Sequence, residues 1–284
     1  MKRIDLNGEW LFKAVNGHKS LPKENRSVAQ WMKGSVPGTV HTDLMANGKI
    51  PDPFFRMNEN DVQWVDSQQW MYRKEFILSK QILAEDVVEL VAGGLDTYAS
   101  MSCNGKKVAE TANMFVEHRF DVKRFLRPGK NIIEIIFDSP TARSKALERK
   151  YGRLQVANNS HRAYVRKAQY SFGWDWGPRL TTSGIWRNIR LEAHGHVTLP
   201  EPFVNVISVT KAEAVLELSI SVSRFTSTPL QLRTTIWDDM AIATDQRRVN
   251  AERMKFRVRI KNPRIWWPNG YGDQPIYRAI FSVQ

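Results

Sequence analysis

The sequence has very little cysteine and no long apolar run, and these absences exclude several kinds of protein. Cys103 is the only cysteine among 284 residues, so the chain can form neither an internal disulfide nor a zinc site built from cysteine ligands. No stretch approaches the roughly 20 apolar residues of a membrane-spanning helix. Asp5, Asn7 and Glu9 interrupt the N-terminus where a signal peptide needs its apolar core. We therefore expect no metal, no cofactor and no membrane partner, and a cytoplasmic location unless a leader was removed.

Acidic residues are scarce relative to basic ones, since 29 Asp and Glu face 42 Lys and Arg, a net charge of +13. Such an excess is typical of proteins that bind nucleic acid. Here the basic residues are scattered, without a run of five or six. The one regular stripe, at 255–261, alternates with apolar side chains, which indicates a strand with one solvated face. We therefore expect no nucleic-acid partner, and a basic nucleic-acid-binding β protein stays the third candidate function.

Most of the chain has the pattern of β-strands. Short segments rich in β-branched and aromatic residues are separated by Gly, Pro and Asn, and only 41–47 and 141–151 have the pattern of helices. The character changes near residues 194–202, where prolines precede a second series of strands. The pattern predicts an all-β protein with a larger domain at residues 1–196. A sandwich of immunoglobulin size is predicted at residues 197–284.

The most unusual segment is RKAQYSFGWDWGPRL at residues 166–180. It places Trp174, Asp175 and Trp176 together between glycines, which predicts a turn or loop. Indole faces can cover the apolar C–H patches of a sugar ring, and a carboxylate can accept hydrogen bonds from sugar hydroxyls. The same composition also suits an aromatic core cluster in which Asp175 binds nearby backbone amides. Composition alone leaves both interpretations open.

Seven segments along nearly the whole chain carry a resemblance to one family: LNGEWLF (6–12), VPGTVHTDLMANGKIPDPF (36–54), DVQWVDSQQWMYRKEF (61–76), GLDTYASMSCNGK (94–106), FGWDWGPR (172–179), SGIWRNIRL (183–191) and NPRIWWPNGYGDQPIY (262–277). In this order they resemble segments of β-mannosidases of glycoside hydrolase family two. FGWDWGPR is the motif that favours mannose over the sugars of related β-galactosidases and β-glucuronidases.

The resemblance implies a jelly-roll (galactose-binding-like) β-sandwich followed by an immunoglobulin-like β-sandwich. In that family a loop of the first domain completes the subsite that holds the terminal mannose of a β-mannoside. By this resemblance Trp174 and Asp175 bind the substrate. Trp176, Arg179 and Arg166 are expected to hold the loop in place.

The resemblance assigns no catalytic residue to this chain. Retaining glycosidases need two carboxyl groups about 5 Å apart, and in this family both are glutamates of a (β/α)8 barrel. Such a barrel takes roughly 200 residues or more, whereas the two sandwiches already occupy the chain. The Asn58-Glu59 dipeptide lies in a first-domain segment and is not expected to be catalytic. We therefore expect the non-catalytic N-terminal part of an exo-β-mannosidase, inactive alone, whose partners are a β-mannoside and its own barrel. The alternatives are a stand-alone carbohydrate-binding module and a part of another family-two glycosidase.

Overall fold

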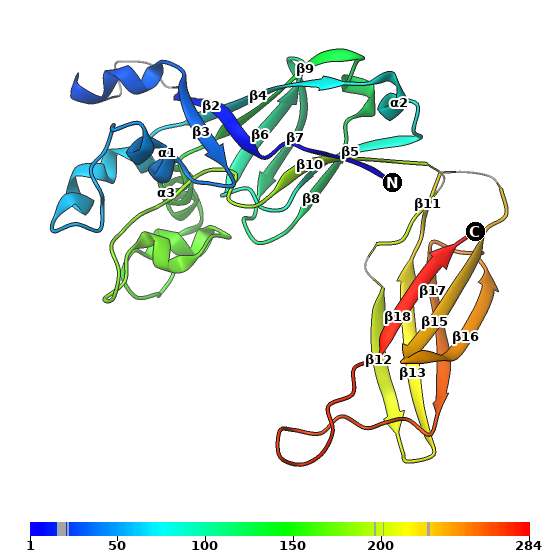
Figure 1. The fold of residues 1–284 in the computed structure, drawn as a ribbon. Helices are drawn as coiled ribbons and strands as arrows, with labels where there is room; N and C mark the ends of the chain where they lie inside the picture. The colour runs from blue at the N-terminus through cyan, green and yellow to red at the C-terminus, as the bar shows by residue number, and fades with distance from the viewer. Residues whose placement is uncertain (16–20, 22, 196, 201, 226–227) are drawn as a thin grey trace. The chain divides into compact units, whose positions relative to one another are not determined.

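A computed structural model describes residues 1–15, 21, 23–195, 197–200, 202–225 and 228–284. It divides the chain into unit 1, Met1–Ala193, and unit 2, His194–Gln284 (Figure 1). The expected boundary after residue 196 falls three residues beyond this division, and residue 196 itself lies outside the described residues. Strands make up most of the regular structure in both units, so the predicted all-β class is confirmed.

Unit 1 is built on a six-stranded sheet of order β3-β2-β4-β9-β6-β7 and a four-stranded sheet of order β1-β10-β5-β8. Neighbouring strands of the larger sheet all run antiparallel. The strands are β1 Lys2–Asp5, β2 Gly8–Ala14, β3 Met32–Val36, β4 Trp70–Leu78, β5 Val87–Ala92, β6 Tyr98–Cys103, β7 Lys106–Ala112, β8 His118–Asp121, β9 Gly129–Phe137 and β10 Ile189–His194.

The core of unit 1 lies between these sheets, because one buried cluster takes side chains from both. In β9, buried and partly exposed residues alternate, as expected when successive side chains point to opposite faces. Phe12 of β2 contacts Trp70 and Tyr72 of β4, with ring centroids 6.0 and 5.5 Å apart. The indole N–H of the buried Trp10 donates to the carbonyl oxygen of Leu6 at 2.8 Å, so its polar atom is satisfied.

Both predicted helices are confirmed, each beginning one residue earlier than expected. Thr39 and Thr42 form a capping box at the start of α1, Val40–Ala46. The Ser139 hydroxyl accepts from the Ala142 amide at the start of α3, Pro140–Tyr151, which ends at Gly152. The remaining helical segments were not predicted: α2 Lys80–Leu83 and the 3-10 helices η1 Lys23–Ala29, η2 Asn58–Ser67, η3 Lys123–Phe125, η4 Ser160–Tyr164 and η5 Gln169–Phe172.

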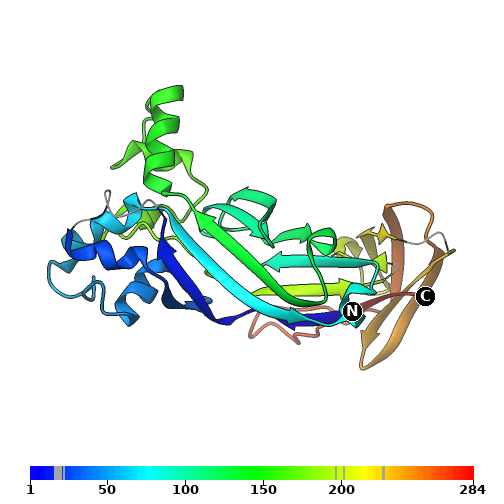
Figure 2. The same ribbon diagram turned by 90° about the horizontal axis from the view of Figure 1, so that it is seen from above.

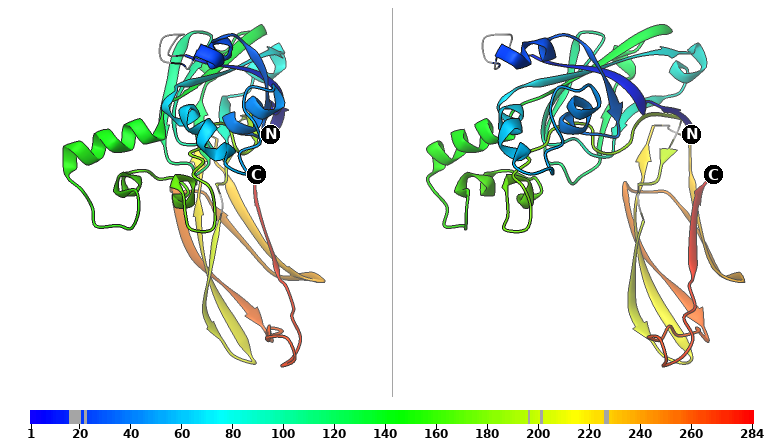
Figure 3. Two further views of the ribbon diagram at one scale, coloured as in Figure 1. Left: turned by 90° about the vertical axis from the view of Figure 1, so that its left-hand side faces the viewer. Right: turned by 60° about the vertical axis from the view of Figure 1, so that its left-hand side comes forward.

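Within unit 1, α1 and α3 lie toward one end and α2 toward the other (Figure 2). The chain after α3 folds back beside that helix through η4 (Figure 3). The buried Ser144 hydroxyl of α3 meets Nδ1 of His161 in η4 at 2.8 Å, and Ser160 donates to Glu148. The segment before residue 174 is therefore packed on a helix. No helix among the described residues is long and apolar enough to span a membrane.

Unit 2 contains three-stranded sheets of order β12-β13-β17 and β16-β15-β18 and a short pair, β11-β14. Its core includes Leu218, Leu232 and Phe256. Exposed and buried residues alternate strictly along β17, where Lys255 and Arg259 pair with glutamates of β13. The basic stripe is thus a solvated face, as predicted. The strands are β11 Val197–Thr198, β12 Phe203–Val209, β13 Glu213–Ser221, β14 Ser223–Arg224, β15 Gln231–Asp238, β16 Met240–Arg248, β17 Arg253–Lys261 and β18 Arg278–Val283.

Candidate functional site

The segment that carries the two predicted sugar-contacting residues forms a tight turn between η5 and β10. Backbone hydrogen bonds of 3.3 and 3.4 Å join Trp174 and Gly177 in both directions. Gly173 precedes the turn with a φ of +94°, and a Cβ there would lie 3.2 Å from Cβ of Arg179. Glycine is suited to this position because a side chain would be strained by the positive φ. The turn therefore presents its two central residues, Asp175 and Trp176, at its tip.

Trp174 and Asp175 are both accessible. The Trp174 ring is 41% exposed, and the Arg162 guanidinium lies 4.9 Å from its centroid. Arg162 is itself buried and donates to the carbonyl oxygen of Ala157, so this cation–π contact holds one face of the indole. The Asp175 carboxylate is exposed and has no hydrogen-bonding or ionic partner among the residues that the structure describes. Its oxygens are therefore free to accept hydrogen bonds from a ligand.

Trp176 contacts other residues than Trp174 does. Its ring is 70% exposed and lies against Tyr170, with the centroids 5.9 Å apart. Both rings line a pocket of about 440 Å³, together with Phe54, Phe115 and Trp186. The two indoles of the turn are thus placed differently, one against Arg162 and one at the edge of a pocket.

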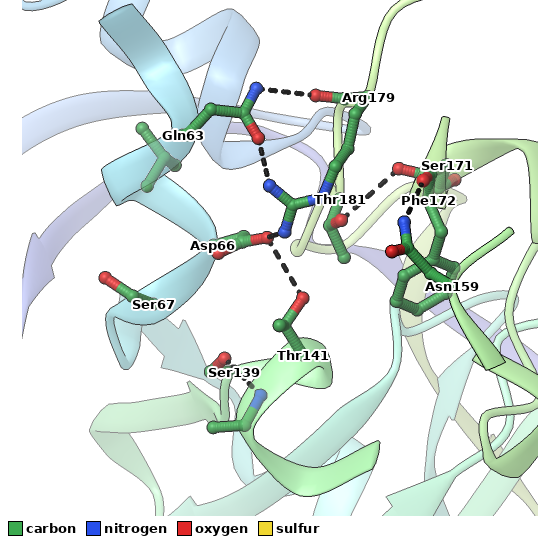
Figure 4. A network of polar contacts seen from close by, with 12 residues as sticks. Gln63, Asp66, Ser67, Ser139, Thr141, Asn159, Ser171, Phe172, Arg179 and Thr181 are labelled. Atoms are coloured by element: carbon green, nitrogen blue, oxygen red, sulfur yellow. Dashed lines mark hydrogen bonds and ion pairs between the residues drawn. The ribbon is translucent and has the colours of Figure 1, made fainter. Parts of the chain in front are cut away.

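Arg179 ties the end of the turn to the rest of unit 1 (Figure 4). Its guanidinium donates to the side-chain oxygen of Gln63 and to the carboxylate of Asp66, both in η2. The Gln63 amide donates back to the carbonyl oxygen of Arg179 at 2.9 Å. Asp66 also accepts from the Thr141 hydroxyl of α3 at 3.0 Å. A charge-assisted network of this kind fixes the direction of the chain.

Arg166 contributes through its backbone. Its carbonyl oxygen accepts from the Met114 amide at 3.1 Å, and the residue forms a parallel bridge with Asn113. Its side chain is exposed. The structure thus brings Trp174, Asp175 and Trp176 together on one turn, whereas Arg166 lies at the base of the loop.

An ion pair that no pattern in the sequence indicates lies under the pocket, between Lys167 and Asp96, each only 1% exposed. The Lys167 ammonium donates to the Asp96 carboxylate and to both the carbonyl and the hydroxyl oxygen of Thr182, at 3.0 and 2.9 Å. Burial lowers the pKa of Lys167. Because Lys167 and Thr182 stand on either side of the turn, this cluster closes the two ends of the loop.

His41, at the start of α1, is buried beside the same ion pair. Burial, with a contribution from Lys167, lowers the pKa of His41 to about 4. Its Nδ1 atom has no hydrogen-bonding partner within the described part of the chain. Across the described ranges, no three His, Cys, Asp or Glu side chains gather closely enough to hold a metal ion.

Comparison with known proteins adds to this geometry. A family model described as the glycosyl hydrolase 2 galactose-binding domain-like family matches residues 10–187. Beta-mannosidase B of Emericella nidulans is 34% identical over 262 residues, which cover 88% of this chain and 30% of that protein. Beta-mannosidase B of Aspergillus terreus is 35% identical, over 92% of this chain and 31% of that protein.

Among solved structures, a β-D-mannosidase from Dictyoglomus thermophilum matches all of this chain and 34% of its own, with a TM-score of 0.90 and 37% identity. The exo-chitosanase CsxA of Amycolatopsis orientalis matches with a TM-score of 0.66 at 19% identity, a likeness of fold alone. The chain spans about a third of the length of the relatives that it matches.

Proposed function

Because the chain belongs to glycoside hydrolase family two, with the galactose-binding-like domain of that family at residues 10–187, we propose that it is the N-terminal, non-catalytic part of a retaining exo-β-mannosidase. In this proposal it contributes the turn at 174–177 to the site that binds a terminal, non-reducing β-D-mannose. The choice of sugar is supported by the β-mannosidases of Emericella nidulans, Aspergillus terreus and Dictyoglomus thermophilum, which are 34%, 35% and 37% identical to this chain.

One observation carries the proposal. At the tip of a turn that Arg179 holds in place, the Asp175 carboxylate has no partner within the described ranges and is flanked by two accessible indoles. A carboxylate accepts strong hydrogen bonds from two neighbouring hydroxyls, and an indole face covers the apolar side of a sugar ring. Trp174 is held by Arg162 and the turn by Arg179. Such pre-organisation reduces the entropy lost when a ligand binds.

We place the chemical step outside this chain. Hydrolysis with retention needs a general acid and a nucleophilic carboxylate about 5 Å apart. We assign both to the two thirds of the relatives' length that this chain does not span. The partners in this proposal are therefore the β-mannoside and a catalytic domain. The chain alone should bind the sugar weakly and should not hydrolyse it.

Titration calorimetry of the chain with methyl β-mannoside tests the proposal. We expect a dissociation constant in the millimolar range, because half of a subsite makes few contacts. Asp175→Ala should raise this constant at least about tenfold, since a hydrogen bond to a charged group contributes about 1.5–3 kcal/mol. The matched control is Asp273→Ala, which removes an exposed aspartate from an aromatic turn of unit 2 and should leave binding unchanged.

Three other results would change the proposal. An unaltered affinity in Asp175→Ala removes that residue from the site. Equal binding of methyl β-glucoside contradicts the preference for mannose. A micromolar dissociation constant identifies a stand-alone carbohydrate-binding module instead.

A further inference from the structure

The pocket of about 440 Å³ beside the turn has no role in the proposed mannose contact. Its volume lies within the range of about 300–1,000 Å³ that is usual for small-molecule sites. Trp176, Gly177 and Pro178 form part of its wall, and Asp175 directly precedes Trp176 in the chain. A group attached to a sugar at Asp175 would therefore have this pocket as its neighbour.

The edge of the pocket is aromatic and open to solvent. Phe54, Phe115, Tyr170 and Trp176 line it, and each of these side chains is more than half exposed. They come from three separate segments of unit 1, since Tyr170 and Trp176 share one loop, so their meeting is a product of the fold. Exposed apolar side chains gathered around one depression mark a binding site, and aromatic rings favour stacked or edge-to-face contact with another ring.

The polar groups at the base of the pocket are already satisfied. Asp96 accepts hydrogen bonds from Lys167, Thr182 and Thr97, and Lys167 has three acceptors for its three hydrogens. The two charges also offset each other. The hydroxyl groups of a polar ligand would find no free hydrogen-bonding partner among these groups, and an unpaired buried hydroxyl is unfavourable. The pocket is therefore suited to an apolar group.

We infer that this pocket binds an aromatic aglycone, the group linked to the mannose, and that the site prefers aryl β-mannosides over alkyl ones. The inference rests on the proposed function for the identity of the sugar. The choice of a flat apolar group rests on the pocket itself, which has four accessible rings at its edge and, at its base, polar groups already bonded to one another.

Nuclear magnetic resonance titration of the ¹⁵N-labelled chain tests this assignment with three probes: 4-nitrophenyl β-mannoside, methyl β-mannoside and 4-nitrophenol. The indole N–H signal of Trp176 is assigned by its loss in Trp176→Phe. We expect the nitrophenyl mannoside to bind about tenfold more tightly than the methyl mannoside. Nitrophenol alone should shift the Trp176 signal. Phe115→Ala should lower the ratio of the two mannoside affinities, whereas Phe203→Ala, which removes an exposed phenylalanine of unit 2, should not.

The three probes separate failure of this inference from failure of the proposed function. Equal affinities for the two mannosides, with an unmoved Trp176 signal, overturn the aglycone pocket and leave the mannose contact standing. Binding of nitrophenol at Trp176, without a shift of the Asp175 signal when either mannoside is added, supports the pocket and refutes the mannose contact. If none of the probes binds, both the aglycone pocket and the mannose contact are wrong.

Discussion

Breaking the ion pair between Lys167 and Asp96 should destabilise unit 1 strongly, and Lys167→Met tests this. Methionine keeps most of the apolar stem but leaves the Asp96 carboxylate buried without its cation. Removing one partner of a buried pair typically costs about 3–5 kcal/mol. In a unit of this size, each kcal/mol lowers the melting temperature by about 2–4 °C. We therefore expect the melting temperature of unit 1 to fall by roughly 6–20 °C.

A double variant separates the buried charge from the lost packing. In Lys167→Met/Asp96→Asn the charge is gone, and the single Asn oxygen can replace one of the two carboxylate oxygens to which Thr97 and Thr182 donate. We expect the double variant to recover at least half of the stability lost in Lys167→Met, which would show that the two substitutions are not additive. The matched control is Lys107→Met, because Lys107 forms a 2.6 Å pair with Glu110 in which both side chains are mostly exposed. Solvent screens such a pair, so little change is expected.

The assay is thermal and urea unfolding followed by circular dichroism and by tryptophan fluorescence. Unit 2 provides an internal reference where its transition is resolved, because neither variant touches it. If Lys167→Met lowers the midpoint no more than Lys107→Met does, the buried pair contributes nothing to stability. A double variant as unstable as the single one would show that the lost stem packing, and not the uncompensated charge, explains the effect.

The remaining predictions concern the pH dependence of stability and the effect of adding a Cβ atom at two glycines. The pKa of His41 is about 4 in the folded chain against 6.5 as its ordinary value, so the unfolded state binds more protons between these values. The neutral His41 should therefore contribute about 3 kcal/mol of stability, fully present above pH 6.5 and lost as the pH falls toward 4, which unfolding measured from pH 7 to pH 4 can show. His41→Gln should remove this loss. An unchanged pH profile in that variant contradicts the assignment. Gly184→Ala should destabilise unit 1 by about 1–3 kcal/mol, because its φ is +146° and a Cβ would lie 2.8 Å from a backbone oxygen. Gly177→Ala, where a Cβ meets nothing within 4 Å, is the control, and equal melting temperatures for the two variants would refute the reasoning.

Local patterns predicted the regular elements of the fold because those elements depend on neighbours in the sequence. The alternation along 254–260 reflects a strand between solvent and core. Proline and serine at the start of α3 and glycine at its end mark that helix. The 3-10 helices escaped prediction because they lack the apolar spacing of an α-helix. The longest of them, η2, nevertheless supplies the Gln63 and Asp66 that hold Arg179.

The candidate site was predictable only where its residues are adjacent in the sequence. Two glycines around Trp174, Asp175 and Trp176 indicate a turn, and the structure has one there. The pocket beside it combines rings from residues as distant as Phe54 and Trp176, which no local pattern connects. The ion pair below it joins residues 71 positions apart. Burial of a lysine depends on that distant partner and leaves no periodic signal in the sequence around residue 167.

The loop between Lys167 and Thr182 is fixed at its base and exposed at its tip. A fixed base allows an exposed side chain at the tip to keep its position. The Lys167–Asp96 pair closes the base, and Arg179 binds the second half of the loop to η2. Between these points, the Asp175 carboxylate has no partner among the described residues. A free carboxylate on a freely moving loop would lose much of its binding energy to ordering. The ion pairs reduce that cost before a ligand binds, so a substitution at the base should weaken the proposed sugar binding as well as stability.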